Sequence, residues 1–188
     1  MQNGTLTITN SQATINLEDK TATYTGSAIS AATATTNSDG TVTYTYYSGA
    51  SCSGTALSGA PTDAGTYSVK AKVEATTNYA SATSECAKLT INAKTITYTA
   101  SATDKTYDGS TSATCSITLS GVATGDTVSA TSTGTFADKN VGTDKTVTCS
   151  SFKLTGADAS NYTISSTSTT TKADINKKSI TAIVNVND

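Results

Sequence analysis

The sequence repeats itself at a spacing of about 84 residues, and this period limits the fold more than any other feature. The stretch "INAKTIT", which begins at Ile91, returns as "INKKSIT" at Ile175, and "TNY" ending at Tyr79 is answered by "SNY" ending at Tyr162. Self-similarity of this kind is typical of tandem modules. We therefore predict two consecutive modules, over residues 5–92 and 93–176, followed at 177–188 by a strand that leads into a further repeat.

Within each period, polar and apolar side chains alternate as they do in half-buried β-strands. In "TYSVKAKVE" (66–74), Tyr67, Val69, Ala71 and Val73 share one face, and Ser and Lys residues occupy the other. Turn sequences such as "NSDG" (37–40) and "TGAD" (155–158) separate these runs. The pattern predicts an all-β protein made of two tandem Ig-like antiparallel β-sandwich modules arranged end to end. A β-grasp-like module is the alternative, and the lack of a helical period disfavours it.

Composition narrows the function. Large aliphatic residues are scarce, but the net charge is only −2 and there are nine Tyr, so small folded cores are expected rather than disorder. The chain has no His, which excludes Ser-His-Asp and Cys-His catalysis and imidazole metal ligands. It also has no Arg and no basic surplus, so nucleic acid is an unexpected partner. We expect no enzymatic activity and no cofactor.

No segment approaches the roughly 20 apolar residues that cross a bilayer, and no signal peptide opens the sequence. This predicts that the fragment makes no membrane contact. We expect it to be a monomer.

Four cysteines occur, two in each module, and each pair has the same separation. Of the three connectivities, Cys52–Cys86 with Cys115–Cys149 is the one that keeps both bonds inside a module. Loops of this length gain roughly 3–4 kcal/mol from closure. Cys115 and Cys149 alternate in phase with apolar neighbours and are expected in the core, whereas Cys52–Cys86 should be a peripheral staple. Buried free thiols, or one zinc ion held by all four sulfurs, are the alternatives.

Several polar and aromatic residues are candidates for binding sites. Tyr44 and Tyr46 share the face of Val42 and are expected to pack in the core, which leaves Tyr47 as a candidate for stacking on a sugar. Asp104, Asp108, Asp126 and Asp138 could bind calcium, but turn and capping roles are favoured because their spacing matches no calcium loop. Lys94 with Asn161 or Asn176 is a formal isopeptide pair.

Specific motifs resemble known repeat families. "KTYDG", "GVATGD", "FADKNVG", "LTGADASNY" and "KADIN", within residues 105–176, resemble the YDG repeats of giant bacterial surface proteins. "YTG", "YTYY", "APTDAGTYSVKA", "NYASATS" and "AKLTI", within residues 11–92, are similar to MBG-type repeats.

The resemblance implies an extracellular segment at the bacterial cell surface. It implies a structural stalk, or spacer, of a large adhesin that projects a distal binding domain and has neighbouring repeats of the same chain as its partners. The alternative is a module that itself binds a host glycan or surface protein.

Overall fold

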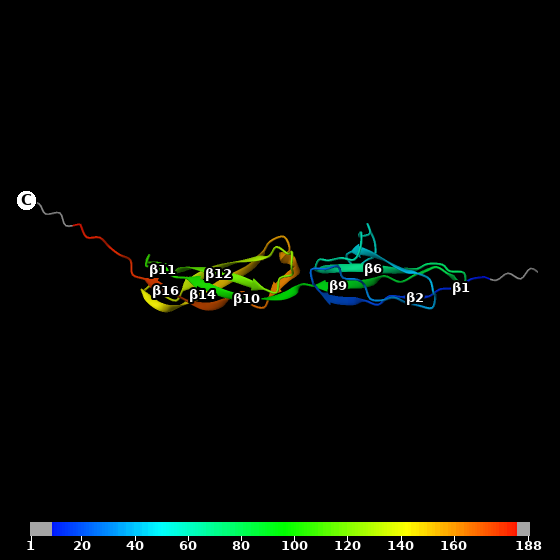
Figure 1. The fold of residues 1–188 in the computed structure, drawn as a ribbon, viewed down its shortest axis with the longest axis horizontal. Helices are drawn as coiled ribbons and strands as arrows, with labels where there is room; N and C mark the ends of the chain where they lie inside the picture. The colour runs from blue at the N-terminus through cyan, green and yellow to red at the C-terminus, as the bar shows by residue number, and fades with distance from the viewer. Residues whose placement is uncertain (1–8, 184–188) are drawn as a thin grey trace, which may run out of the picture. The chain divides into compact units, whose positions relative to one another are not determined.

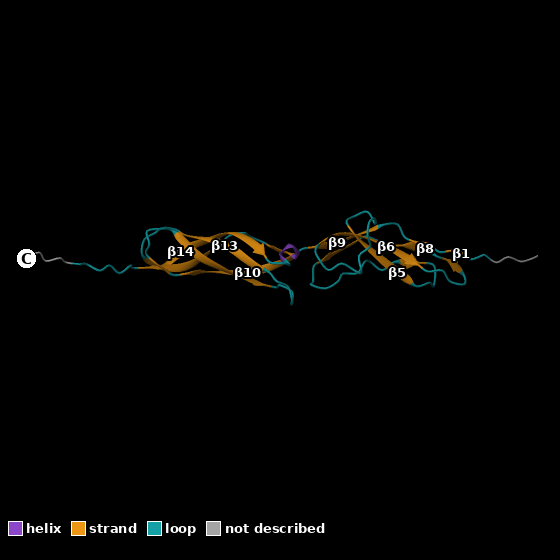
Figure 2. Ribbon diagram, turned by 90° about the horizontal axis from the view of Figure 1, so that it is seen from above, coloured by secondary structure: helices purple, strands orange, loops and turns teal. Residues whose placement is uncertain are grey.

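The computed structural model describes residues 9–183, and strands account for nearly all of its regular structure (Figure 1, Figure 2). One three-residue 3-10 helix, η1 (Ala159–Asn161), is the exception within this described range. The chain divides into two compact units, unit 1 up to Lys94 and unit 2 from Thr95. The prediction of an all-β protein is confirmed.

Unit 1 is built on a sheet with the strand order β3-β9-β6-β5, and β8 adds to β6. The strands are β3 (Lys20–Thr23), β5 (Val42–Ser48), β6 (Gly65–Val73), β8 (Ala82–Thr83) and β9 (Ala87–Asn92). Two short pairs complete the unit: β1 (Ser11–Gln12) with β7 (Tyr79–Ala80), and β2 (Ile15–Asn16) with β4 (Thr35–Thr36). β3 runs parallel to β9, whereas β5–β6 and β6–β9 are antiparallel.

The core of unit 1 follows the alternation of β6 and β9. Val69, Ala71 and Val73 of β6 are almost completely buried, as are Leu89 and Ile91 of β9. Ser68 departs from the alternation, because it points to the face expected to meet water and yet is fully buried. Its hydroxyl accepts a hydrogen bond from the backbone N–H of Cys52 at 2.8 Å, so the loop that carries Cys52 covers this position.

Unit 2 forms one seven-stranded sheet in the order β11-β16-β14-β13-β12-β10-β15. Its strands are β10 (Lys94–Thr103), β11 (Lys105–Thr106), β12 (Ser112–Ser120), β13 (Ser129–Phe136), β14 (Gly142–Thr155), β15 (Tyr162–Ile164) and β16 (Thr169–Asn176). β11 is parallel to β16, and the pairs β10–β12, β12–β13, β13–β14 and β14–β16 are antiparallel.

Strand β12 changes partner part of the way along its length. Ser112 and Ala113 pair with β13, and from Thr114 to Ser120 the strand pairs with β10 instead. A strand that switches partner in this way lets a sheet turn a corner. The core cluster accordingly combines buried residues of β13, β14 and β16 with half-buried residues of β10 and β12.

A bulge in β14 changes which residues face the core. Val147 and Cys149 are buried in strict alternation, and then Phe152 is buried although it is out of phase with them. Between them Ser151 has φ of 57°, and the register with β13 shifts between Thr131 and Thr133. An extra residue in one strand reverses the faces of all the residues that follow it. The bulge therefore brings Phe152 into the core, where its ring lies 5.1 Å from that of Tyr98 in an edge-on arrangement.

The segment after β16 differs from prediction. Residues 177–183 form no strand, although a strand was predicted over 177–188; residues 184–188 lie outside the described part, as does the predicted start of the first module at residue 5. A strand is stable only when its backbone groups are paired. The corresponding earlier segment, β10, pairs with β12, which lies downstream of it, and no strand follows Asn176 among the described residues.

Candidate functional site

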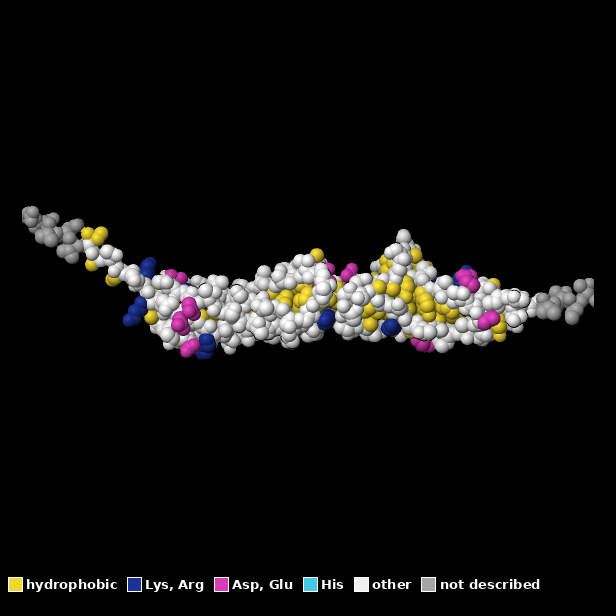
Figure 3. Space-filling view, in the orientation of Figure 1, with side chains coloured by type: hydrophobic (Ala, Val, Ile, Leu, Met, Phe, Trp, Pro, Cys, Tyr) yellow, Lys and Arg dark blue, Asp and Glu magenta, His cyan; other side chains and the backbone are white. Residues whose placement is uncertain are grey.

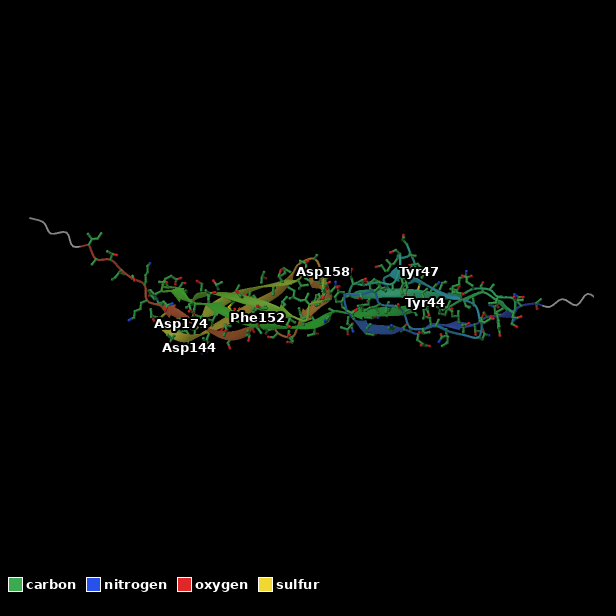
Figure 4. All side chains as sticks on the ribbon, viewed as in Figure 1. Tyr44, Tyr47, Asp144, Phe152, Asp158 and Asp174 are labelled. Atoms are coloured by element: carbon green, nitrogen blue, oxygen red, sulfur yellow. A yellow bond between two sulfur atoms is a disulfide. The ribbon has the colours of Figure 1, made fainter. Side chains whose placement is uncertain are left out.

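Tyr47, the candidate for ligand stacking, lies at the end of β5 beside the loop that follows it (Figure 4). It is half-buried, and its backbone forms an isolated bridge with Ala56 of that loop. Tyr46 is buried, and its hydroxyl accepts the N–H of Ala31 at 3.1 Å. Tyr44 is half-buried, and its hydroxyl accepts the N–H of Ala34 at 2.9 Å. Two of these tyrosines therefore hold the strandless segment before β4, and the third borders a loop.

The bond Cys52–Cys86 joins that loop to the residue just before β9, with 5.9 Å between the Cα atoms. Cys86 is exposed and Cys52 is half-buried. Cys52 has φ of 46°, a left-handed conformation that non-glycine residues seldom adopt. This disulfide lies at the periphery of unit 1 and anchors a loop.

The bond Cys115–Cys149 joins β12 to β14, again with 5.9 Å between the Cα atoms. Cys149 is completely buried within the core cluster, and Cys115 packs against that cluster. Strand β13 lies between these two strands, and Gly134 of β13 pairs with Ala113 on one side and with Cys149 on the other. The disulfide crosses β13 at a residue with no side chain.

The motifs "KTYDG", "FADKNVG" and "KADIN" meet at one end of unit 2, which we call the distal end. Lys105 lies at its centre, with its side chain largely buried. Its Nζ donates to Asp108 Oδ1, to the carbonyl and hydroxyl oxygens of Ser110 and to the carbonyl oxygen of Ser112, all within 3.1 Å. It also lies 5.5 Å from the centre of the Phe136 ring. This one ammonium group closes the turn between β11 and β12.

Carboxylates complete the distal end. The hydrogen bond from Lys105, followed by those from Ser110, lowers the pKa of Asp108 to about 2. Asp138 accepts from Lys145 at 2.7 Å, and this contact lowers the pKa of Asp138. The exposed position of both carboxylates means that they act as turn anchors in contact with water rather than as buried reactive groups.

Two further aspartates link three chain segments at the distal end. Asp104 accepts a hydrogen bond from the N–H of Asp174 at 2.7 Å, and Asp174 in turn accepts from the N–H of Asp144 at 2.8 Å. Asp144 has φ of 50°, so the carboxylate of Asp174 holds a bulge in β14. Asp144 and Asp174 lie together at this end in Figure 4, and Asp158 lies at the other end of unit 2.

The motifs "GVATGD" and "LTGADASNY" meet at that other, proximal end. The hydroxyl of buried Tyr162 accepts the N–H of Ala123 at 2.8 Å and donates to the carboxylate of Asp126. Asp158 accepts the N–H of Thr127 at 2.7 Å. A side chain at Gly156 would overlap the carbonyl of Thr127. Each motif at this end serves to fix one loop against another.

The four aspartates that are candidate calcium ligands all have such local partners, and Asp138 also accepts the N–H of Asn140. Across residues 9–183, no group of three or more acidic or cysteine side chains has a geometry that could hold a metal ion. Within the same residues, no helix has the length and apolar character that crossing a membrane requires.

Some structural residues were missed by sequence reasoning. Ser84 is buried, with its hydroxyl accepting the N–H of Ala71 and donating to the carbonyl of Glu85. Gly134 and Lys105 owe their roles to neighbours from distant strands, and periodicity carries no signal for them. Tyr162 stood in a repeated "NY" pair, and Lys105 and Tyr162 both lie in motifs of the YDG resemblance, which were the available hints.

Two known domain families match the parts of the chain that contain these motifs. The YDG domain profile matches residues 92–185, and the MBG domain profile matches residues 13–95. No curated protein and no solved structure matches the chain. The motifs that build both ends of unit 2 thus belong to a domain family that covers half of the sequence. The chain belongs to the YDG family, with an MBG domain preceding the YDG domain in tandem.

Proposed function

We propose that this chain is a structural spacer within a larger bacterial surface protein, and that it holds a distal binding domain away from the cell. One observation carries the proposal: the motif residues of the YDG domain serve contacts inside unit 2. Lys105, Asp174, Asp158 and Tyr162 all anchor turns or loops. Because the characteristic residues of this domain maintain its fold, they are occupied in a structural role. We therefore also propose that the chain has no catalytic role.

We further propose that each unit is an Ig-like β-sandwich and that the units follow one another end to end. The partner change of β12 and a core with contributions from both arms of the sheet support the sandwich in unit 2. The junction supports a short connection, because only Ala93 separates β9 from β10. Small-angle scattering tests this: an elongated monomer is expected, and a compact particle would contradict it.

We place the protein outside the cell, at the bacterial surface. Two disulfides support an oxidising compartment, where such bonds persist. The assignment to the surface depends on the resemblance to repeats of surface proteins.

The alternative function, direct binding of a host glycan or surface protein, depends on Tyr47. A half-buried ring beside Ala56 offers a smaller stacking platform than an exposed one. A glycan array and a mucin pull-down with the monomeric chain separate the two functions. The spacer predicts no saturable binding, whereas binding that is lost in Tyr47→Ala, with the fold retained, would favour the alternative.

A further inference from the structure

The exposed large hydrophobic side chains of residues 9–183 all lie at the distal end of unit 2 or in the segment that follows it. Tyr107 and Val141 are at the distal end of unit 2, and Ile180 and Ile183 are in the segment that follows it. Ile180 is 91% exposed and Ile183 is 84% exposed. Figure 3 shows hydrophobic side chains along this segment, next to lysines. Isolated exposed residues need no explanation, but a contiguous group indicates an interaction surface.

A groove joins three of these residues, Tyr107, Val141 and Ile180. It has a volume of about 390 Å³ and is lined by Tyr107, Val141, Lys177, Lys178 and Ile180. Its floor is apolar, and the two lysines are exposed beside it. We call these five residues the distal groove.

The internal repeat identifies what would cover the segment. Ile180 corresponds to Ile96 of β10, and Ile96 is only 2% exposed. There it meets the loop after β12, because a Cβ on Gly121 would lie 3.6 Å from its side chain. The same residue type in the same repeat position is thus buried once a β12-like strand and its following loop are present.

The tyrosine of the groove has a repeat counterpart too. Tyr107 donates its N–H to the carbonyl of Asn176 at 2.8 Å, and Tyr24 donates its N–H to the carbonyl of Asn92 at 2.9 Å. Tyr24 is 3% exposed, and Tyr107 is 36% exposed. Equivalent backbone positions therefore differ more than tenfold in the exposure of their side chains.

We propose that the distal groove and residues 178–183 form a docking site for a further YDG-type module. In this arrangement residues 178–183 become its first strand, equivalent to β10, and the proximal loops of that module cover Tyr107 and Val141. This inference rests on the tandem arrangement in the proposed spacer function. It deepens that function by naming the partner module and the surface to which it docks.

Charge favours this partner over other occupants of an apolar groove. The groove presents Lys177, and Lys178 beside it begins the segment that the added module takes as its first strand. The proximal end of a YDG module, as unit 2 shows it, carries the carboxylates of Asp126 and Asp158 on its loops. Figure 4 shows Asp158 at the end of unit 2 opposite to Asp144 and Asp174. A lysine at one end of the module and carboxylates at the other make successive modules complementary.

A three-module chain tests the proposal: residues 1–188 followed directly by a second copy of residues 105–176, so that residues 178–188 stand where 94–104 stand in unit 2. A reference chain joins residues 1–176 to a second copy of 93–176. Calorimetry should show an added unfolding transition in both, and hydrogen exchange should show protection of residues 178–183 in the first. The proposal would be overturned if the added module folded in the reference chain but not in the first three-module chain.

Substitutions then test each part. In the three-module chain, Ile180→Asn should lower the melting temperature of the added module by roughly 10 °C or more. In the 188-residue chain it should leave both units unchanged, since Ile180 is exposed. Tyr107→Ser with Val141→Ser should lower the added transition and change the 188-residue chain much less.

An unchanged added transition in Ile180→Asn would overturn the strand assignment. Equal effects of the Tyr107 and Val141 changes in both chains would overturn the docking surface. A glycan ligand found for the chain would refute the spacer function and leave these melting measurements as they are, so the two failures are distinguishable.

Discussion

The Sγ atom of Cys115 lies 2.8 Å from the point where a Cβ atom on Gly134 would stand. The carbonyl oxygen of Ala113 lies 2.6 Å from the same point. Real Cβ atoms do not approach other atoms this closely. The absence of a side chain at Gly134 thus allows a disulfide to reach from β12 across β13 to β14, and it couples the stability of unit 2 to one glycine.

Gly134→Ala should destabilise unit 2 by roughly 1–3 kcal/mol, because the added methyl group overlaps both a backbone carbonyl and the disulfide. Thermal unfolding followed by circular dichroism measures the effect. Gly142→Ala is the matched control, since the nearest atoms to its new methyl group belong to Lys145 at 3.5 Å and beyond, which is ordinary contact. Equal melting temperatures for the two variants would contradict the overlap.

Removing the core disulfide should cost more than removing the peripheral one. Cys115→Ala with Cys149→Ala loses the loop constraint and also loosens a core that contains the fully buried Cys149. Cys52→Ala with Cys86→Ala loses mainly the loop constraint. Loss of a native disulfide from a small domain typically costs about 2–5 kcal/mol. We expect a larger fall in melting temperature for the first pair.

Peptide mapping without reductant comes before that comparison, and a peptide joining Cys52 to Cys115 would overturn the pairing. If mapping agrees but both double variants melt alike, the distinction between a core bond and a peripheral one is wrong.

The two disulfides should also differ in their reactivity. A thiolate must reach a sulfur atom to reduce it. Cys86 is exposed, whereas Cys149 is completely buried. Under native conditions, a low concentration of dithiothreitol followed by alkylation should label Cys52 and Cys86 before Cys115 and Cys149. Alkylation of Cys115 and Cys149 first, detected by mass spectrometry, would argue against the burial of the second bond. As a control, the difference in labelling between the two bonds should disappear in denaturant.

Acid should weaken unit 2 through Asp108. Its pKa is lowered from 3.8 to about 2 in the folded protein, chiefly by the hydrogen bond from Lys105. A lowered pKa gives stability that is present above the unfolded value and is lost as the pH falls through the folded value. Asp108→Asn should therefore lower the melting temperature at pH 7, and its difference from the unmodified protein should shrink between about pH 4 and pH 2.

A constant difference across that range would show that the charge of Asp108 contributes nothing. Asp138→Asn provides a comparison, since contact with Lys145 lowers the pKa of Asp138 in the same direction.

Tyr162→Phe should destabilise the proximal end of unit 2. It leaves the N–H of Ala123 without its acceptor and removes the donor to Asp126. A lost hydrogen bond that leaves a polar group buried typically costs about 1–3 kcal/mol. Tyr98→Phe is the control, because the Tyr98 hydroxyl donates over 3.4 Å to the carbonyl of Ser168 at an exposed position. Hydrogen exchange should rise around residues 121–127 in the first variant and not in the second.

The sequence by itself determined the strand content and the repeat. Alternation along "TYSVKAKVE" reflects the two faces of a strand, a local property that needs no partner, and Val69, Ala71 and Val73 are buried as it predicts. The motifs were likewise sufficient to identify the family, because each one is a short run of residues that can be recognised without the tertiary structure. In both cases the information lies within a short stretch of chain.

Only the tertiary structure decided which residues those strands bring together. The bulge at Ser151 reverses the alternation and buries Phe152, and Ser68 is buried because a distant loop lies over it. Gly134 looks like any glycine until β12 and β14 flank it. The predicted strand after Asn176 has the right pattern yet does not form in residues 177–183, because a strand needs a neighbour with which to share its hydrogen bonds. Periodicity indicates the local conformation and the face that each residue favours, whereas pairing between distant segments determines which residues it contacts.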